Sequence, residues 1–276
     1  MIRRLLWAVR RELWESRWLY IAPASMAVVL LIGFAAYAFR LPDHPTRQVA
    51  VEPYDAVAGL MMIAGLLVSI IYCVDALYSE RRDRSILLWK SLPVSDSLTV
   101  VAKLFIPIVL LPLLVWALTV GVHLNMLLIN SAVLATRGQS VGELWLQVQP
   151  LSNSLLLLYH LLALHGLSAA PLYAWMILVS AWAPRAPLAW AILPPVAVGF
   201  LERIAFGTVH FAELMLSRLA GGLENVNTPP GGALMDSMTL LPLGQFLIAP
   251  RLWVGFAITA VFVAGSIRLR RLAHPA

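Results

Sequence analysis

The chain has few charged residues and a single cysteine. Charged residues make up 12% of its 276 positions, against about 25% in an average soluble domain. Because Cys73 has no second cysteine to pair with, an intramolecular disulfide and a cysteine-based metal site are excluded. The sequence also lacks a Gly-x-x-x-x-Gly-Lys-Ser/Thr phosphate-binding loop. We therefore expect a non-catalytic chain that binds no cofactor and no metal, and any ATP must be handled by a partner.

What the chain has in abundance is apolar sequence. Hydrophobic residues account for 61% of it, and the mean hydropathy is +0.82. A helix needs about 20 apolar residues to cross roughly 30 Å of hydrocarbon. The sequence therefore predicts an all-α integral membrane protein, with a single transmembrane domain over residues 1–276 and six spans at 18–39, 56–78, 104–129, 154–182, 188–206 and 246–267.

The basic residues predict how the chain is oriented. Six spans place both termini on one side, and loops that face the cytoplasm carry an excess of lysine and arginine. With cytoplasmic termini, 14 of the 20 basic residues lie inside. The other six lie outside or near the outer boundary, and they are Arg40, Arg47, Arg137, Arg203, Arg218 and Arg251. The net charge of +6 is thus attributed to cytoplasmic loops and anionic lipid, and no nucleic-acid partner is expected.

Two further segments have features of membrane-associated structure. Residues 1–17 place Ile2, Leu5, Leu6, Val9 and Leu13 at helical spacing, which predicts an amphipathic helix lying in the inner headgroup layer. This helix is either a plain anchor or also a flank for a cytoplasmic partner. Between the fifth and sixth spans, residues 207–245 alternate apolar pieces with turn signals, which predicts a re-entrant outer segment. The shorter stretch 41–55 is predicted to be a polar outer loop.

The segment 79–98, between the second and third spans, mixes arginines with large apolar side chains. Ser79 is predicted to cap a helix that begins at Glu80, Leu92-Pro93 to end it, and Ser95 or Asp96 to cap the next helix. Tryptophan and arginine are common energetic anchors of protein interfaces. The segment is therefore either a docking surface for a cytoplasmic partner or an amphipathic piece that lies on lipid headgroups.

The string Glu80-Arg-Arg-Asp-Arg-Ser-Ile-Leu-Leu-Trp-Lys-Ser-Leu-Pro-Val-Ser-Asp96, after the second span and preceded by an amphipathic N-terminal helix, resembles the permease subunits of the ABC-2 type exporter family. The resemblance implies a bacterial inner-membrane subunit that forms a dimer, with a second copy as the expected partner, and binds two separate ATPase subunits. It also implies that segment 79–98 is the coupling segment, with contacts by Glu80, Arg81, Arg82, Arg84, Ile86, Leu87, Trp89 and Lys90. The family exports varied cargoes, so the cargo does not carry over.

Several polar residues lie inside or beside the predicted spans. His160 and His165 are five apart, about 500° around an α-helix, which argues against a shared metal. His123 and Asn125 are expected to have hydrogen-bonding partners within the protein. A carboxylate at Asp75 is costly unless it is paired, and arginines of the coupling segment are its expected partners. Two other functions stay open: a secondary transporter driven by an ion gradient, and a membrane-embedded enzyme using the histidines.

The neighbouring residues Glu202 and Arg203 lie at the outer end of the fifth predicted span. Their side chains can reach the membrane interface by snorkelling. Adjacent positions of a helix point about 100° apart, so we expect each of the two to find a partner other than its neighbour.

Overall fold

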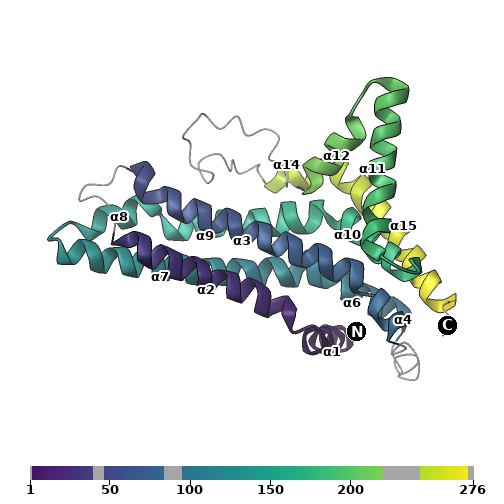
Figure 1. The fold of residues 1–276 in the computed structure, drawn as a ribbon, viewed down its shortest axis with the longest axis horizontal. Coiled ribbons are helices and arrows are strands. Elements are labelled where there is room, and N and C mark those ends of the chain that lie inside the picture. Colours follow the sequence, from purple (N-terminus) through teal and green to yellow (C-terminus); the bar gives the residue numbers. More distant parts are fainter. Residues whose placement is uncertain (1, 40–46, 84–94, 220–242, 273–276) are drawn as a thin grey trace.

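The structure is a computed structural model that describes residues 2–39, 47–83, 95–219 and 243–272. Within these ranges all regular secondary structure is helical, with no strand (Figure 1). The helices are α1 (Ile2–Glu15), α2 (Trp18–Ala38), α3 (Arg47–Asp75), α4 (Tyr78–Arg82), α6 (Asp96–Phe105), η1 (Ile106–Leu110), α7 (Leu111–Thr136), α8 (Val141–Val148), α9 (Pro150–Tyr159), η2 (His160–Ser168), α10 (Ala170–Trp182), α11 (Pro187–Phe206), α12 (His210–Leu219), α14 (Leu243–Ile248) and α15 (Pro250–Leu272).

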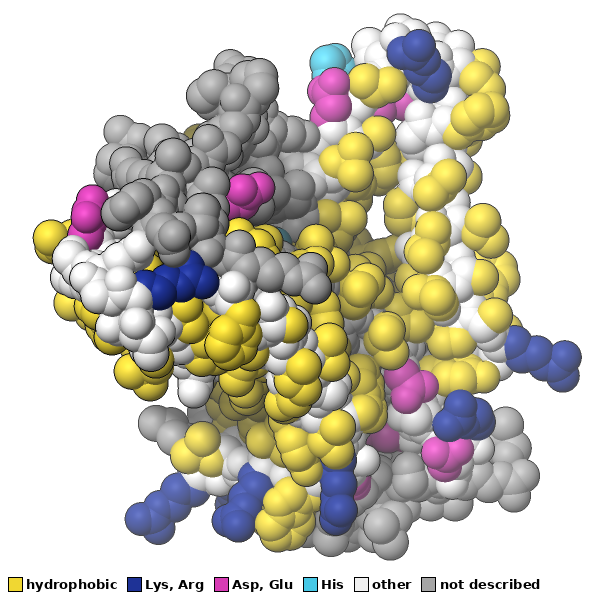
Figure 2. All heavy atoms as spheres, turned by 60° about the vertical axis from the view of Figure 1, so that its left-hand side comes forward, with side chains coloured by type: hydrophobic (Ala, Val, Ile, Leu, Met, Phe, Trp, Pro, Cys, Tyr) yellow, Lys and Arg dark blue, Asp and Glu magenta, His cyan; other side chains and the backbone are white. Residues whose placement is uncertain are grey.

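Six helical stretches are long and apolar enough to cross a membrane, as predicted. They are Trp18–Ala38, Val51–Arg82, Asp96–Thr136, Val141–Ser168, Pro187–Phe206 and Pro250–Leu272, accompanied by the shorter apolar helix Ala170–Trp182. Figure 2 shows hydrophobic side chains over the middle of one face and basic side chains along its lower rim. The chain is therefore a multi-pass membrane protein.

Two boundaries differ from the prediction. The stretch 41–55 is not a loop throughout, because α3 begins at Arg47 and passes through Pro53. The predicted fourth span, 154–182, is not one continuous α-helix but is divided among α9, η2 and α10. Gln149, in the left-handed conformation with φ of 45°, separates α8 from α9. Propensity places these boundaries poorly, since tertiary packing overrides it.

The core lies between α3 and the helices around it. At one end, Tyr54 of α3 packs against Phe34 of α2, and its hydroxyl accepts a hydrogen bond from Asn130 of α7 at 3.2 Å. His123 also lies there, with Nε2 3.0 Å from the carbonyl oxygen of Tyr54, and Asn125 donates to Gly121 O at 2.8 Å. The prediction that both polar groups have internal partners is confirmed.

Two π-helical stretches, η1 and η2, pack against each other in the middle of the molecule. A π-helix has i→i+5 hydrogen bonds and is rare outside single turns. The two meet closely, because a Cβ atom added to Gly166 of η2 would overlap the backbone oxygen of Ile108 in η1. His160 and His165 both lie in η2, so the spacing of 500° that was calculated for an α-helix does not apply to them.

A tryptophan compensates for a proline in α11. Pro195 has no N–H to donate to the carbonyl oxygen of Ala191 four residues earlier. In the structure, Trp175 of α10 donates its Nε1–H to that oxygen at 3.0 Å. An unsatisfied carbonyl is costly at membrane depth, and a neighbouring helix is a usual source of such a replacement.

Helices α11 and α12 form a hairpin that projects from the bundle (Figure 1). The turn is fastened by Glu202, whose carboxylate accepts hydrogen bonds from Thr208 Oγ1 at 2.7 Å, His210 N at 2.9 Å and Phe211 N at 2.8 Å. Glu202 therefore binds the amides at the start of α12, which confirms that its partner is not Arg203. Only 6% of the most apolar stretch of α11 is buried, against 56% for the second and third spans.

Candidate functional site

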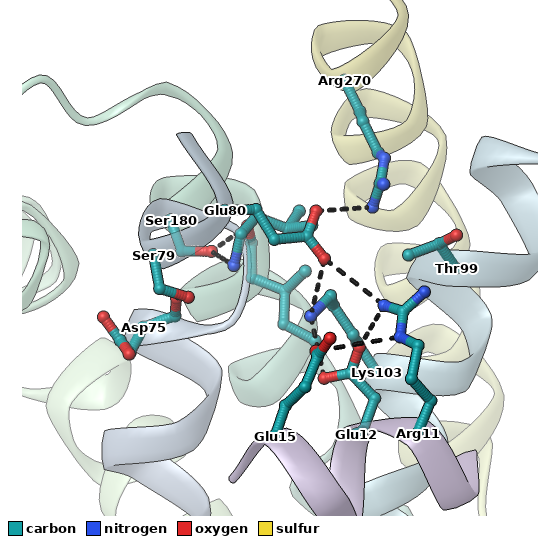
Figure 3. Close-up of polar contacts among 12 residues, drawn as sticks. Arg11, Glu12, Glu15, Asp75, Ser79, Glu80, Thr99, Lys103, Ser180 and Arg270 are labelled. Atoms are coloured by element: carbon teal, nitrogen blue, oxygen red, sulfur yellow. Dashed lines mark hydrogen bonds and ion pairs between the residues drawn. The ribbon is translucent and has the colours of Figure 1, made fainter. Parts of the chain in front are cut away.

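The most unusual feature of the described residues is a buried cluster of ion pairs that joins α1, α4, α6 and α15 (Figure 3). Helix α1 is seen end-on in Figure 1, and so lies across the spans, with Arg11 and Glu12 in its last turns. Glu80 comes from α4, Lys103 from α6 and Arg270 from the last turn of α15. Four helices thus each contribute a charge, and two of them, α1 and α15, lie near opposite ends of the sequence.

Lys103 is the centre of the cluster. Its Nζ lies 2.9 Å from Glu12 Oε2 and 3.1 Å from Glu80 Oε1, and its side chain is 3% exposed. Tyr72 of α3 donates its hydroxyl hydrogen to Glu12 Oε2 at 3.1 Å. Burial by itself raises the pKa of Glu12, but attraction by Lys103 and Arg11, with hydrogen bonds from Lys103 and Tyr72, outweighs it and lowers this pKa below its ordinary value. Glu12 is therefore ionised although its side chain is buried.

Glu80 connects the remaining cations. Its Oε2 lies 3.0 Å from Arg270 Nη1, and its Oε1 lies 3.7 Å from Arg11 Nη2. Arg270 also donates from Nε to Asp96 Oδ1 at 3.0 Å. Asp96 lies in the first turn of α6, where a negative charge is stabilised by the positive end of the helix dipole. Three cations, Arg11, Lys103 and Arg270, thus meet four carboxylates, those of Glu12, Glu80, Asp96 and the less buried Glu15, which lies 3.7 Å from Arg11 Nε.

A second set of contacts fastens α4 to the end of α10. Arg81 donates from Nη2 to the backbone oxygens of Ser180 and Ala183, both at 2.8 Å. These carbonyls belong to the C-terminal turn of α10, where a cation is favourable. Ser180 Oγ in turn accepts from Leu77 N at 3.0 Å. The start of the predicted coupling segment is therefore held by two separate sets of bonds.

A cavity of about 370 Å³ lies beside the cluster. Its walls include Glu12, Tyr72, Glu80 and Lys103 of the cluster, together with Asp75 and Arg82. Among the described side chains Asp75 forms no ion pair at contact distance, because Arg81 binds the end of α10 and Arg82 pairs with Asp83 at 3.0 Å. Of the predicted arginine partners, Arg82 is attracted to the charge of Asp75 from a greater distance, and Arg84 lies outside the described residues. Asp75 instead lies where the cavity can admit water to a carboxylate.

The predicted coupling residues have different environments. Glu80 is 5% exposed and points into the cluster, Arg81 is half-buried, and the side chain of Arg82 is 58% exposed. The predicted helix end at Leu92-Pro93 lies outside the described residues. So do the remaining predicted contacts, which are Arg84, Ile86, Leu87, Trp89 and Lys90.

Both cap predictions can be compared with the structure. Ser95 caps α6, as predicted, since its side chain accepts a hydrogen bond from Leu98 N at 3.3 Å. Ser79 does not cap α4, which begins after Leu77 without a side-chain cap, and the Ser79 hydroxyl donates back to Asp75 O at 2.9 Å. A serine inside a helix commonly makes this backward bond.

Sequence reasoning missed the cluster as a whole. Glu12 lies in the amphipathic helix that the sequence predicts over residues 1–17, and nothing in that pattern gives it a partner. The available signal was Lys103 itself, an ionisable residue surrounded by Val100, Val101, Ala102 and Leu104, because such a residue in an apolar run implies a buried partner. Which carboxylate would reach it could not be found, since Glu12 is 91 positions away.

The cluster has the character of a structural joint. Within the described ranges, no group of three or more His, Cys, Asp or Glu side chains is placed to hold a metal ion. Comparisons with protein-family models, with curated proteins and with solved structures find no match to this chain.

Proposed function

We propose that this protein is the permease subunit of an ATP-driven ABC exporter, related to the ABC-2 type permeases. In this proposal two ATPase subunits bind the cytoplasmic segment 79–98 of a permease dimer in a bacterial inner membrane. The chain supplies the path through the membrane and takes no part in ATP hydrolysis. The resemblance of residues 80–96 to the family motif, and the missing phosphate-binding loop, support this assignment.

The observation that carries the proposal is the position of Glu80. It lies four residues before Arg84, at the beginning of the predicted coupling segment, and pairs with Lys103 and Arg270. A partner that displaces this segment would have to move α6 and α15 with it, because separating buried charges costs several kcal/mol. The ion-pair cluster would thus transmit a push on the cytoplasmic segment to the spans.

The N-terminal helix takes part in the same joint. Arg11 pairs with Glu80, and Glu12 pairs with Lys103. The amphipathic helix α1 is therefore bonded to the start of the coupling segment and to α6. Trp7 and Trp14 of α1 remain exposed. We infer that α1 flanks the ATPase site in addition to anchoring in the headgroup layer.

The test is association with an ATPase subunit. Affinity purification of the chain from its native membrane, under gentle extraction, should recover a soluble ATPase. Arg82→Ala and Trp89→Ala should each reduce that recovery, since the Arg82 side chain is exposed and its loss should leave the fold intact. Arg137→Ala is the matched control, because Arg137 is also exposed but lies at the start of the α7–α8 connection.

Several outcomes would contradict the proposal. One is a monomer that purifies without any ATPase. Another is transport in vesicles that survives ATP depletion but is abolished by an uncoupler, which would identify an ion-driven secondary transporter instead. A third is a labelling result that places an introduced cysteine at Arg82 on the external side of intact cells.

A further inference from the structure

Two arginines meet where the end of α12 reaches the start of α15. Arg218 lies in the last turn of α12, and Arg251 lies in the first turn of α15. Figure 1 shows this end of α12 beside α14, and Arg270 of the ion-pair cluster lies at the opposite end of α15. Arg218 donates from Nη2 to the backbone oxygen of Arg251 at 3.0 Å, and Arg251 donates from Nη2 to Ser217 Oγ. The two arginines therefore form a group of their own, separate from the cluster.

Arg218 is held in place inside the protein. It is only 4% exposed, and its Nη1 donates to Ser168 O, at the end of η2, at 2.9 Å. A Cβ atom added to Gly255 of α15 would lie 2.7 Å from that nitrogen and 3.3 Å from Arg218 Cζ, so the guanidinium occupies the space beside a missing side chain. Burial and repulsion by Arg251 both lower the pKa of Arg218, but a guanidinium stays protonated in proteins. The chain thus fixes a buried positive charge at this junction.

No carboxylate among the described side chains neutralises this pair. The bonds of Arg218 and Arg251 go to two carbonyl oxygens and one hydroxyl, and neither arginine forms an ion pair. Glu213, the nearest acidic residue along the chain, lies 3.7 Å from His210 instead. The carbonyl at the end of η2 offsets part of the charge of Arg218, but the first turn of α15 favours an anion over the cation that it carries. In the ion-pair cluster, by contrast, each buried cation has a carboxylate partner.

We propose that Arg218 and Arg251 form a binding site for a phosphate group. A phosphate monoester carries roughly −1.5 to −2 charges at neutral pH, so one such group neutralises both arginines, whereas a carboxylate neutralises only one. A guanidinium also pairs with a phosphate through two parallel N–H···O bonds. Arg251 is exposed and can meet the ligand first. Buried Arg218 gains most from the pairing, because charges attract more strongly at low dielectric. The site lies outside the segment proposed to bind an ATPase and does not depend on that proposal.

Stabilisation by inorganic phosphate tests this site. The full chain in a non-ionic detergent is unfolded by heat and followed by tryptophan fluorescence, in increasing sodium phosphate at an ionic strength held constant with sodium chloride. A ligand that binds only the folded protein raises the Tm according to its dissociation constant. Arg251→Gln should raise that constant about tenfold, because it removes a charged hydrogen-bond donor, and the fold should survive since Arg251 is exposed. Arg251→Lys keeps the charge and should retain most of the binding.

The controls separate a site from a general effect of the salt. Arg185→Gln is the matched variant, because Arg185 is also exposed but lies between α10 and α11, and its dissociation constant for phosphate should equal that of the unaltered protein. Phosphate salts also stabilise proteins by exclusion from their surface. A Tm that does not rise, or that rises without saturation and equally in all variants, would overturn the proposal. So would an unchanged constant in Arg251→Gln.

The source of the phosphate group is decided in the same assay. Phosphatidic acid, which carries a phosphate monoester, is added to the detergent micelles, with phosphatidylcholine as the control lipid. If phosphatidic acid alone displaces inorganic phosphate, the site is supported with a lipid headgroup as its ligand. If neither lipid displaces inorganic phosphate from a site that Arg251→Gln weakens, the site is supported with a soluble phosphate compound as its ligand.

Discussion

The ion-pair cluster and the α11–α12 hairpin hold their helices in opposite ways. In the cluster, four helices are fixed by buried charges at 2.9 to 3.1 Å between Lys103, Glu12, Glu80 and Arg270. In the hairpin, α11 is almost unburied and is held mainly by the bonds of Glu202 and by Trp175. A cluster of buried charges has one arrangement in which all its members are paired, whereas apolar contacts such as those of α11 have no such single arrangement.

The fixed arrangement of the cluster matches the role proposed for the cytoplasmic segment. A segment that receives force from a partner must not slide against the spans, and paired buried charges resist sliding because each displaced charge loses its partner. Substitutions in the ion-pair cluster should therefore cost more stability than substitutions in the α11–α12 hairpin.

The largest effect is expected from Glu80→Gln. Removing this charge leaves Lys103 with one anion fewer and removes the carboxylate of the Arg270 pair, and breaking a buried pair typically costs ~3–5 kcal/mol. Thermal or denaturant unfolding in detergent, followed by tryptophan fluorescence, measures the loss. Glu202→Gln in the hairpin is the control and should cost clearly less, since Glu202 faces solvent at the turn. Equal losses in the two variants would refute the contrast.

A glycine pair gives the next largest difference. Gly166→Ala places a methyl group on the backbone oxygen of Ile108, and overpacking of this kind typically costs ~1–3 kcal/mol. In Gly199→Ala the new methyl group lies 3.8 Å from Phe211 Cδ1 and 3.9 Å from Ala212 Cβ, which are ordinary contacts. This second variant should be neutral or more stable, by up to ~1 kcal/mol, because alanine favours the helix. The same unfolding assay decides, and a stable Gly166→Ala protein would show that η1 and η2 are not closely packed.

The smallest effect is expected from acid titration of Glu12. Its pKa is lowered in the folded protein from an ordinary value of 4.5, so its contribution to stability is complete above pH 4.5 and is lost as the pH falls through the folded-state pKa. The loss should be less than that of Glu80→Gln, because a protonated Glu12 can still accept hydrogen bonds from Lys103 and Tyr72. The measurement is the stability difference between the unaltered protein and Glu12→Gln from pH 7 down to pH 3. That difference should shrink below pH 4.5, and a constant difference would mean that Glu12 is not ionised in the fold.

The sequence predicted most of the helices but not how several of them join. Six apolar stretches, the amphipathic helix over residues 1–17 and the cap at Ser95 all depend on neighbouring residues, and the structure has each of them. The break of the fourth predicted span into α9, η2 and α10 was missed. Proline positions such as Pro107 and Pro112 indicate disturbance of a helix, but they do not specify a π-helix, which depends on what packs against it.

The candidate site shows the same division more sharply. Segment 79–98 could be selected from its mixture of arginines and apolar side chains, yet the burial of Glu80 could not, because it depends on Lys103 and on Arg270 near the other end of the chain. The sequence by itself determined that the chain is helical and crosses a membrane, since apolar content and helical period are local properties. Only the tertiary structure decided which charges meet, because Arg270 and Asp96 are 174 positions apart and yet 3.0 Å from each other.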